Sequence, residues 1–221
     1  CPNKVTYRGG ALAESVLGYY CPDIPFNNSS GLIGAHEEEL YSGKDVRTTI
    51  DLGWQRLADS LLWANANETD GFDHACLVVM DVRDGGLPVV VNLSHESDAG
   101  YGLGNRAMEL DYEPGPVMKP LVWTVAMKDG MFRPDSPMAE TISSGKIAKT
   151  YKAMPEHFTR SLKECLLQEG YIREDIHDAG DIRINTPESK DWSESEVDEL
   201  AHGWAMKMTA THIAAFYSTL A

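Results

Sequence analysis

The sequence predicts an α/β (α+β) fold in which helices pack against an antiparallel β-hairpin. Two apolar runs, residues 75–82 and 88–93, flank the turn Arg83-Asp84-Gly85-Gly86, and Asp-Gly between two β-prone runs is typical of a hairpin. Residues 52–62 and 117–126 place apolar side chains at helical spacing. Because both strands are almost wholly apolar, both faces of the hairpin need cover. A chain of 221 residues with 43% hydrophobic content can bury such a core.

The part of the chain before the hairpin divides into a loop-rich segment and a helix. Residues 1–46 are rich in Gly, Asn, Ser and Pro, which predicts loops and short elements lying on the rest of the chain. Residues 47–221 are expected to form the main domain. Its first helix begins after Thr49 or Asp51, and either residue is a suitable N-cap. In the hairpin, we expect a polar residue at Val79 to reduce the amount of soluble folded protein.

The stretch 105–120 joins the hairpin to the next helix. It begins as a polar turn, tightens at Pro114-Gly115 and continues into an apolar helix that ends at Asp129-Gly130. Pro116 is tolerated at the start of this helix because the N–H groups of a first turn have no intrahelical partner. Lys119 follows one turn later.

Beyond residue 130 the chain becomes more polar. Residues 156–169 have the spacing of an amphipathic helix, and residues 203–221 predict an apolar helix. Residues 188–200 are acidic and Ser-rich and are interpreted as a solvated face or loop. His202 and His212 show no acidic or thiol partner at ligand spacing, so both are interpreted as core or surface histidines.

Composition and cysteine spacing exclude several classes of function. The net charge of −15 argues against a nucleic-acid surface, which needs clustered Lys and Arg. No metal or other cofactor is expected, because the four cysteines show neither Cys-x-x-Cys nor zinc spacing, and they are Cys1, Cys21, Cys76 and Cys165. Residues 102–107 resemble a dinucleotide fingerprint only superficially, since they do not follow a strand directly. No apolar run reaches the ~18 residues of a membrane helix.

The stretch around Lys119 resembles the active-site motif of the penicillin-binding protein transpeptidases, class B, of the cell-division or elongation type. In that family a segment reading Asn-Arg-Ala … Glu-Pro-Gly-Ser-x-x-Lys-Pro places a nucleophilic serine at the start of a central helix. Here Asn105-Arg106-Ala107, Glu113-Pro114-Gly115 and Lys119-Pro120 match, and Pro116 occupies the serine position. Residues 9–45, Gln55 and residues 203–221 resemble the family's linker, entry helix and terminal helix in the same order.

The resemblance implies an incomplete serine transpeptidase/β-lactamase-like fold. The chain would supply the first two strands of the family's sheet and stop before its Lys-Thr-Gly strand. The open sheet edge is then expected to be covered by self-association, by a partner protein or by the N-terminal segment.

The resemblance also implies a chemistry that this sequence lacks. In the family the serine attacks a D-Ala-D-Ala carbonyl, and the lysine and a Ser-x-Asn motif manage the protons. Pro116 has neither a hydroxyl nor an N–H, and the 221 residues contain no Ser-x-Asn, Lys-Thr-Gly or Lys-Ser-Gly. No catalytic residue is therefore assigned. Lys119, the retained motif lysine, is interpreted as a cation paired with a neighbouring carboxylate or carbonyl.

The function expected on this basis is a catalytically inactive penicillin-binding-protein-like domain of the bacterial envelope. It would act as a scaffold in cell-wall synthesis or division, or bind peptidoglycan stem peptides, in a periplasmic or other extracytoplasmic location. Cys1 is either the lipid-acceptor cysteine of a mature lipoprotein or an arbitrary boundary of the sequence. Two alternatives remain open. One is an active transpeptidase or carboxypeptidase completed by another chain, with Ser143, Ser144 or Ser161 as nucleophile, and the other is an unrelated small-ligand module.

Overall fold

The computed structural model describes residues 12–20, 29–68, 72, 74–94, 104–133, 135, 144–167, 183–184 and 194–221. Two compact units are present, and the boundary between them lies between Leu110 and Asp111. The division expected after residue 46 stays a prediction. None of the described helices combines the length and apolarity that crossing a bilayer requires.

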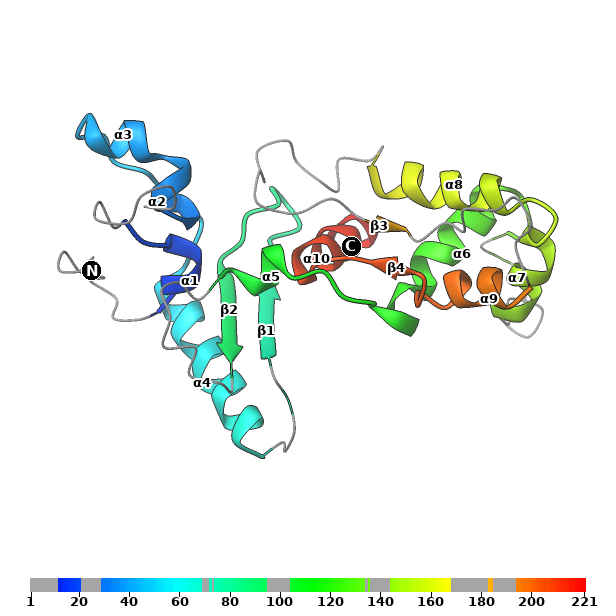
Figure 1. The fold of residues 1–221 in the computed structure, drawn as a ribbon, viewed down its shortest axis with the longest axis horizontal. Helices are drawn as coiled ribbons and strands as arrows, with labels where there is room; N and C mark the ends of the chain where they lie inside the picture. Colours follow the sequence, from blue (N-terminus) through cyan, green and yellow to red (C-terminus); the bar gives the residue numbers. More distant parts are fainter. Residues whose placement is uncertain are drawn as a thin grey trace. The chain divides into compact units, whose positions relative to one another are not determined.

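The first unit is built on the predicted hairpin (Figure 1). Strands β1 (His74–Val79) and β2 (Val89–Ser94) pair antiparallel, with Val79 opposite Val89 and His74 opposite Ser94. This confirms the hairpin that the Asp-Gly turn predicts. The helices of this unit are α1 (Glu14–Leu17), α2 (Gly31–Ala35), α3 (Glu37–Tyr41), α4 (Leu52–Glu68) and α5 (Arg106–Glu109).

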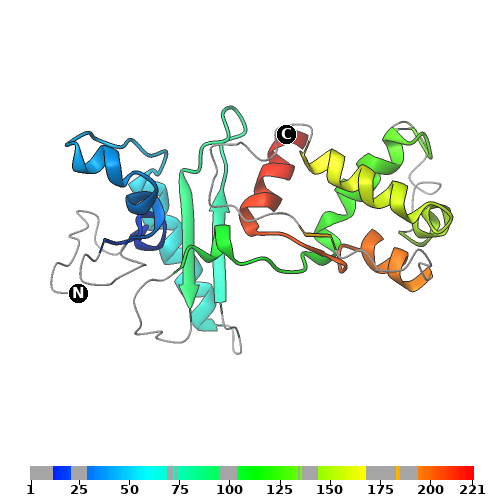
Figure 2. The same cartoon turned by 45° about the horizontal axis from the view of Figure 1, so that its top comes forward.

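Helix α4 covers one face of the hairpin (Figure 2). Ala58, Leu62 and Ala66 pack against side chains that alternate along both strands, namely Ala75, Leu77, Val89, Val91 and Leu93. Of the two N-cap candidates, Asp51 caps the helix, because its Oδ1 accepts from the N–H groups of Gly53 at 2.8 Å and Trp54 at 3.0 Å. The Thr49 hydroxyl instead accepts from the N–H of Leu87 at 2.9 Å.

The opposite face of β2 contacts α5 and α1. Asn92 points to this face, since strand side chains alternate. Its Oδ1 accepts from the N–H of Ala107 at 2.7 Å, and its Nδ2 donates to Ser15 Oγ at 2.9 Å. Coverage of β1 is less complete, because Val79 is 41% exposed whereas Val90 in β2 is fully buried. The loss of folded protein expected for a polar residue at Val79 therefore applies to Val90 instead.

The second unit is helical. Its elements are η1, a 3₁₀ turn (Gly115–Met118), α6 (Lys119–Lys128), α7 (Ser144–Tyr151), α8 (Pro155–Leu167), β3 (Arg183–Ile184), α9 (Glu194–Ala201), β4 (Met206–Lys207) and α10 (Ala210–Leu220). Strands β3 and β4 pair antiparallel. The core of this unit includes Leu121, Val125, Phe158, Leu200 and Phe216. Together the two units form a mixed architecture of helices and an antiparallel hairpin, which confirms the predicted α+β class.

Four sequence-based interpretations change in the second unit. The helix expected over 203–221 begins only at Ala210, and Met206–Lys207 form β4 instead. The expected helix over 117–126 is divided, because residues 115–118 form a 3₁₀ turn before α6 begins at Lys119. The acidic stretch 188–200 is not simply solvated: residues 194–200 are helical and bury Val197 and Leu200, while residues 188–193 lie outside the described residues. His202 does have an acidic neighbour, since its Nδ1 lies 3.6 Å from Asp198 Oδ2.

Candidate functional site

The motif turn places Pro116 and Lys119 at the junction of η1 and α6. Gly115 adopts φ +62°, a left-handed conformation that glycine tolerates and other residues rarely adopt. Gly115 is buried, whereas the following Pro116 is exposed. Lys119 is the first residue of α6 and is half-buried. The position that carries a serine in the resembling family is therefore accessible to solvent and holds a pyrrolidine ring.

A segment from the end of the chain holds this turn in place. The Gly115 N–H donates to the Gly203 carbonyl at 3.1 Å, and Tyr112 and Met208 exchange two backbone hydrogen bonds of 3.0 Å. The Trp204 ring lies against Gly115, where an added Cβ would meet it at 3.0 Å. The Tyr217 hydroxyl donates to the Val117 carbonyl. The sequence predicted only that these C-terminal residues form a helix. No pattern in the neighbouring sequence indicated that they contact the motif turn.

The hydrogen bonds of the turn limit the chemistry that it supports. An oxyanion hole needs N–H groups that are free to donate to a developing negative charge. Pro116 has no N–H, and the N–H of Gly115 is already bonded to Gly203. The same proline offers no hydroxyl for an acyl intermediate. Neither residue can therefore contribute a donor or a nucleophile to acyl transfer.

Lys119 retains a cation at the turn. Within the described part of the chain, its ammonium group makes no hydrogen bond and no ion pair, so the expected pairing with a neighbouring carboxylate or carbonyl is not found there. A half-buried ammonium without such a partner can bind an anionic group.

The Asn-Arg-Ala part of the motif belongs to the first unit. Asn105 is buried, and its Oδ1 accepts from Asn92 Nδ2 at 3.2 Å. Arg106 contacts the His74 ring at 2.8 Å between Nη1 and Nε2. Asn105 and Ala107 thus hold α5 on the hairpin, while the Glu-Pro-Gly…Lys-Pro part belongs to the second unit.

A second polar cluster joins three helices of the second unit. Asp129, at the end of α6, accepts from the Tyr151 hydroxyl at 2.5 Å, and its Oδ2 lies 2.9 Å from His157 Nε2. Ser161 Oγ lies 3.5 Å from the same nitrogen. In a catalytic triad the serine and the carboxylate contact opposite nitrogens of the histidine. Because both contact Nε2 here, the imidazole cannot relay a proton between them.

The cavity beside this cluster is small. Its volume is about 110 Å³, and it is lined by Val125, Lys128, Asp129, Ser161, Glu164 and Cys165. Ligand clefts of about 300 Å³ or more are usual for substrates of drug size. The geometry and the cavity thus give Ser161 no support as a nucleophile. Ser143 lies outside the described residues, and so does the side chain of Ser144.

The hydrogen bond between Tyr151 and Asp129 should make the stability of the protein depend on pH in the alkaline range. Burial, and secondly the hydrogen bond to Asp129, raise the pKa of Tyr151 above its ordinary value. A raised folded-state pKa contributes stability that is present below the unfolded pKa of about 10 and is lost as pH rises above it. We expect Tyr151→Phe to flatten the alkaline part of the curve of unfolding free energy against pH, measured by urea denaturation from pH 8 upward. Parallel curves for the two proteins would contradict this.

The described residues contain no cluster of three or more His, Cys, Asp or Glu side chains that could hold a metal. Cys76 is half-buried and Cys165 is buried, and neither forms a disulfide. Burial raises the pKa of the Cys76 thiol, which disfavours the reactive thiolate. Cys1 and Cys21 lie outside the described residues.

Residues 75–161 match the family model described as the penicillin binding protein transpeptidase domain. The matched segment includes all but the first residue of β1, together with β2, α5 and the turn that carries Pro116 and Lys119.

Solved structures share the fold. The D,D-transpeptidase domain of a peptidoglycan glycosyltransferase from Eggerthella lenta matches with a TM-score of 0.71 and 18% identity, over 98% of this chain and 63% of that one. Penicillin binding protein 3 from Mycobacterium tuberculosis matches with a TM-score of 0.66 and 20% identity, over 97% and 58%. A peptidoglycan synthetase from Bifidobacterium adolescentis matches with a TM-score of 0.69 and 15% identity, over 99% of this chain and 50% of that one. This chain therefore spans 50–63% of the length of these structures.

Proposed function

We propose that this chain is a catalytically inactive, penicillin-binding-protein-like domain of the bacterial envelope. It would serve cell-wall synthesis or division as a scaffold, or hold peptidoglycan stem peptides without cutting them. The observation that carries the proposal is Pro116, which stands at the accessible position of the motif serine and is followed three residues later by the motif lysine. The location would be extracytoplasmic.

The chemistry of the turn supports inactivity at this position. Acyl transfer by this motif needs a hydroxyl, an N–H at the same residue and a base. Only Lys119 remains of these three at the turn, and residues that act as a catalytic unit lose nearly all their effect when one is removed.

The retained features suit non-covalent binding. Lys119 provides a positive charge, and exposed apolar groups of Val117, Trp204 and Tyr217 surround the same turn. A peptide that ends in a carboxylate would pair its charge with the ammonium and lay its side chains on this surface. The stem peptides of peptidoglycan have that chemistry, and wall-synthesis proteins are the alternative partners.

We expect no covalent penicillin adduct on this protein. Penicillin binding protein 3 from Mycobacterium tuberculosis has been solved with ampicillin, so a penicillin is a suitable probe of the same fold. After incubation with ampicillin, the intact mass of the purified chain should remain that of the unmodified protein. Circular dichroism on the same sample establishes that the protein is folded.

The Pro116→Ser variant sharpens this test. It restores the hydroxyl and the N–H of residue 116, but the 221 residues still contain no Ser-x-Asn or Lys-Thr-Gly segment, so its mass should also remain unmodified. An adduct on the unaltered chain would overturn the proposal. If peptide mapping placed that adduct on Ser143, Ser144 or Ser161, it would favour the active alternative.

A further inference from the structure

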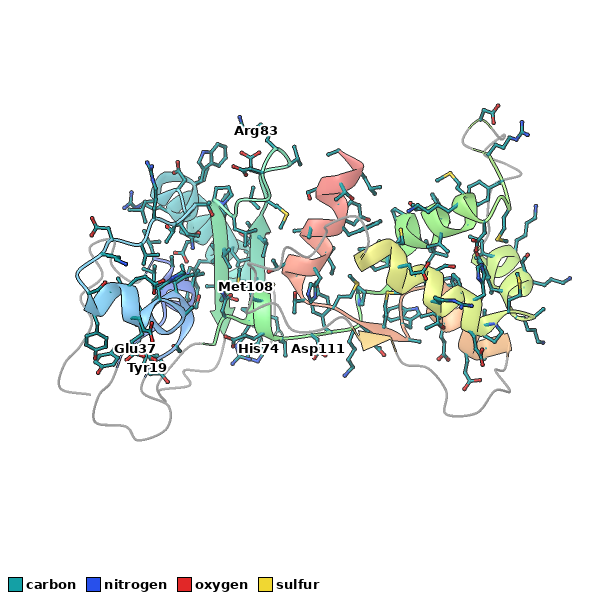
Figure 3. The ribbon with its side chains drawn as sticks, turned by 90° about the horizontal axis from the view of Figure 1, so that it is seen from above. Tyr19, Glu37, His74, Arg83, Met108 and Asp111 are labelled. Carbon is teal, nitrogen blue, oxygen red and sulfur yellow. The ribbon has the colours of Figure 1, made fainter. Side chains whose placement is uncertain are left out.

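We draw no further inference here: the strongest candidate, the largely apolar pocket that Tyr20 forms with α2 and α3 beside Glu37 (Figure 3), carries none, because nothing in the structure shows what covers it.

Discussion

Gly203→Ala is expected to lower the free energy of unfolding by about 4 kcal/mol or more, in the upper range of single substitutions. Gly203 has φ +79°, and an added Cβ would lie 2.3 Å from the Gly115 carbonyl oxygen. That oxygen belongs to the backbone of the motif turn, so it cannot move aside as a flexible side chain would. Either the hydrogen bond from Gly115 to Gly203 breaks, or the turn that carries Pro116 shifts.

Gly130→Ala is the matched control for this prediction. Gly130 belongs to the same unit and has φ +72°, but no described atom lies within 4 Å of the position of its added Cβ. This variant should lower the free energy of unfolding by only about 1–2 kcal/mol, which is the strain of a non-glycine residue in the left-handed conformation. Urea denaturation of the two variants beside the unaltered chain measures both costs. Equal costs would mean that the contact between Gly203 and Gly115 does not hold the turn.

Gln55→Leu is expected to cost about 2–6 kcal/mol, because leucine leaves the buried N–H and C=O of Val90 without partners, at about 1–3 kcal/mol for each group. The buried Gln55 amide donates to the Val90 carbonyl at 2.6 Å and accepts from the Val90 N–H at 2.9 Å, and leucine fills a similar volume without replacing either bond. The loss should therefore exceed that of an ordinary surface substitution on the same helix.

Arg56→Leu provides the comparison. Arg56 is the next residue of α4 and is exposed, so its replacement should change the free energy of unfolding by no more than about 0.5 kcal/mol. Both variants are measured by urea denaturation. If Gln55→Leu costs no more than Arg56→Leu, the amide of Gln55 does not close the edge of β2 in solution.

Local patterns predicted most of the secondary structure because they depend on neighbours along the chain. The Asp84-Gly85 turn and the apolar runs beside it were sufficient for the hairpin. Residues 156–169 predicted α8 within two residues at each end. The choice between Thr49 and Asp51 as N-cap could not be made this way, because the Thr49 hydroxyl bonds instead to Leu87, which is distant in sequence.

The acidic stretch shows where local reasoning was wrong. Residues 194–200 contain mostly charged and polar side chains, which favoured a solvated loop. Val197 and Leu200 nevertheless lie three residues apart on one helix face, and both are fully buried. Two apolar residues are a weak signal in a short sequence window, and only the surface against which they pack makes them core residues.

Some properties of the candidate site are evident from the sequence, and others are evident only from the structure. That residue 116 lacks a hydroxyl and an N–H is evident from the sequence, because both properties belong to proline itself. That the N–H of Gly115 is already bonded is evident only from the structure, because its acceptor, Gly203, comes from the other end of the unit. The lack of a described partner for Lys119 likewise depends on the surroundings of the turn.

By itself, then, the sequence determined most of the types of element, the hairpin and the lack of a hydroxyl and an N–H at Pro116, since each depends on a residue and its near neighbours. The tertiary structure alone decided which edge of the hairpin Gln55 closes and what holds the motif turn. Those features arise where segments distant in the chain meet, and their hydrogen bonds and buried surfaces exist only after those segments have folded together.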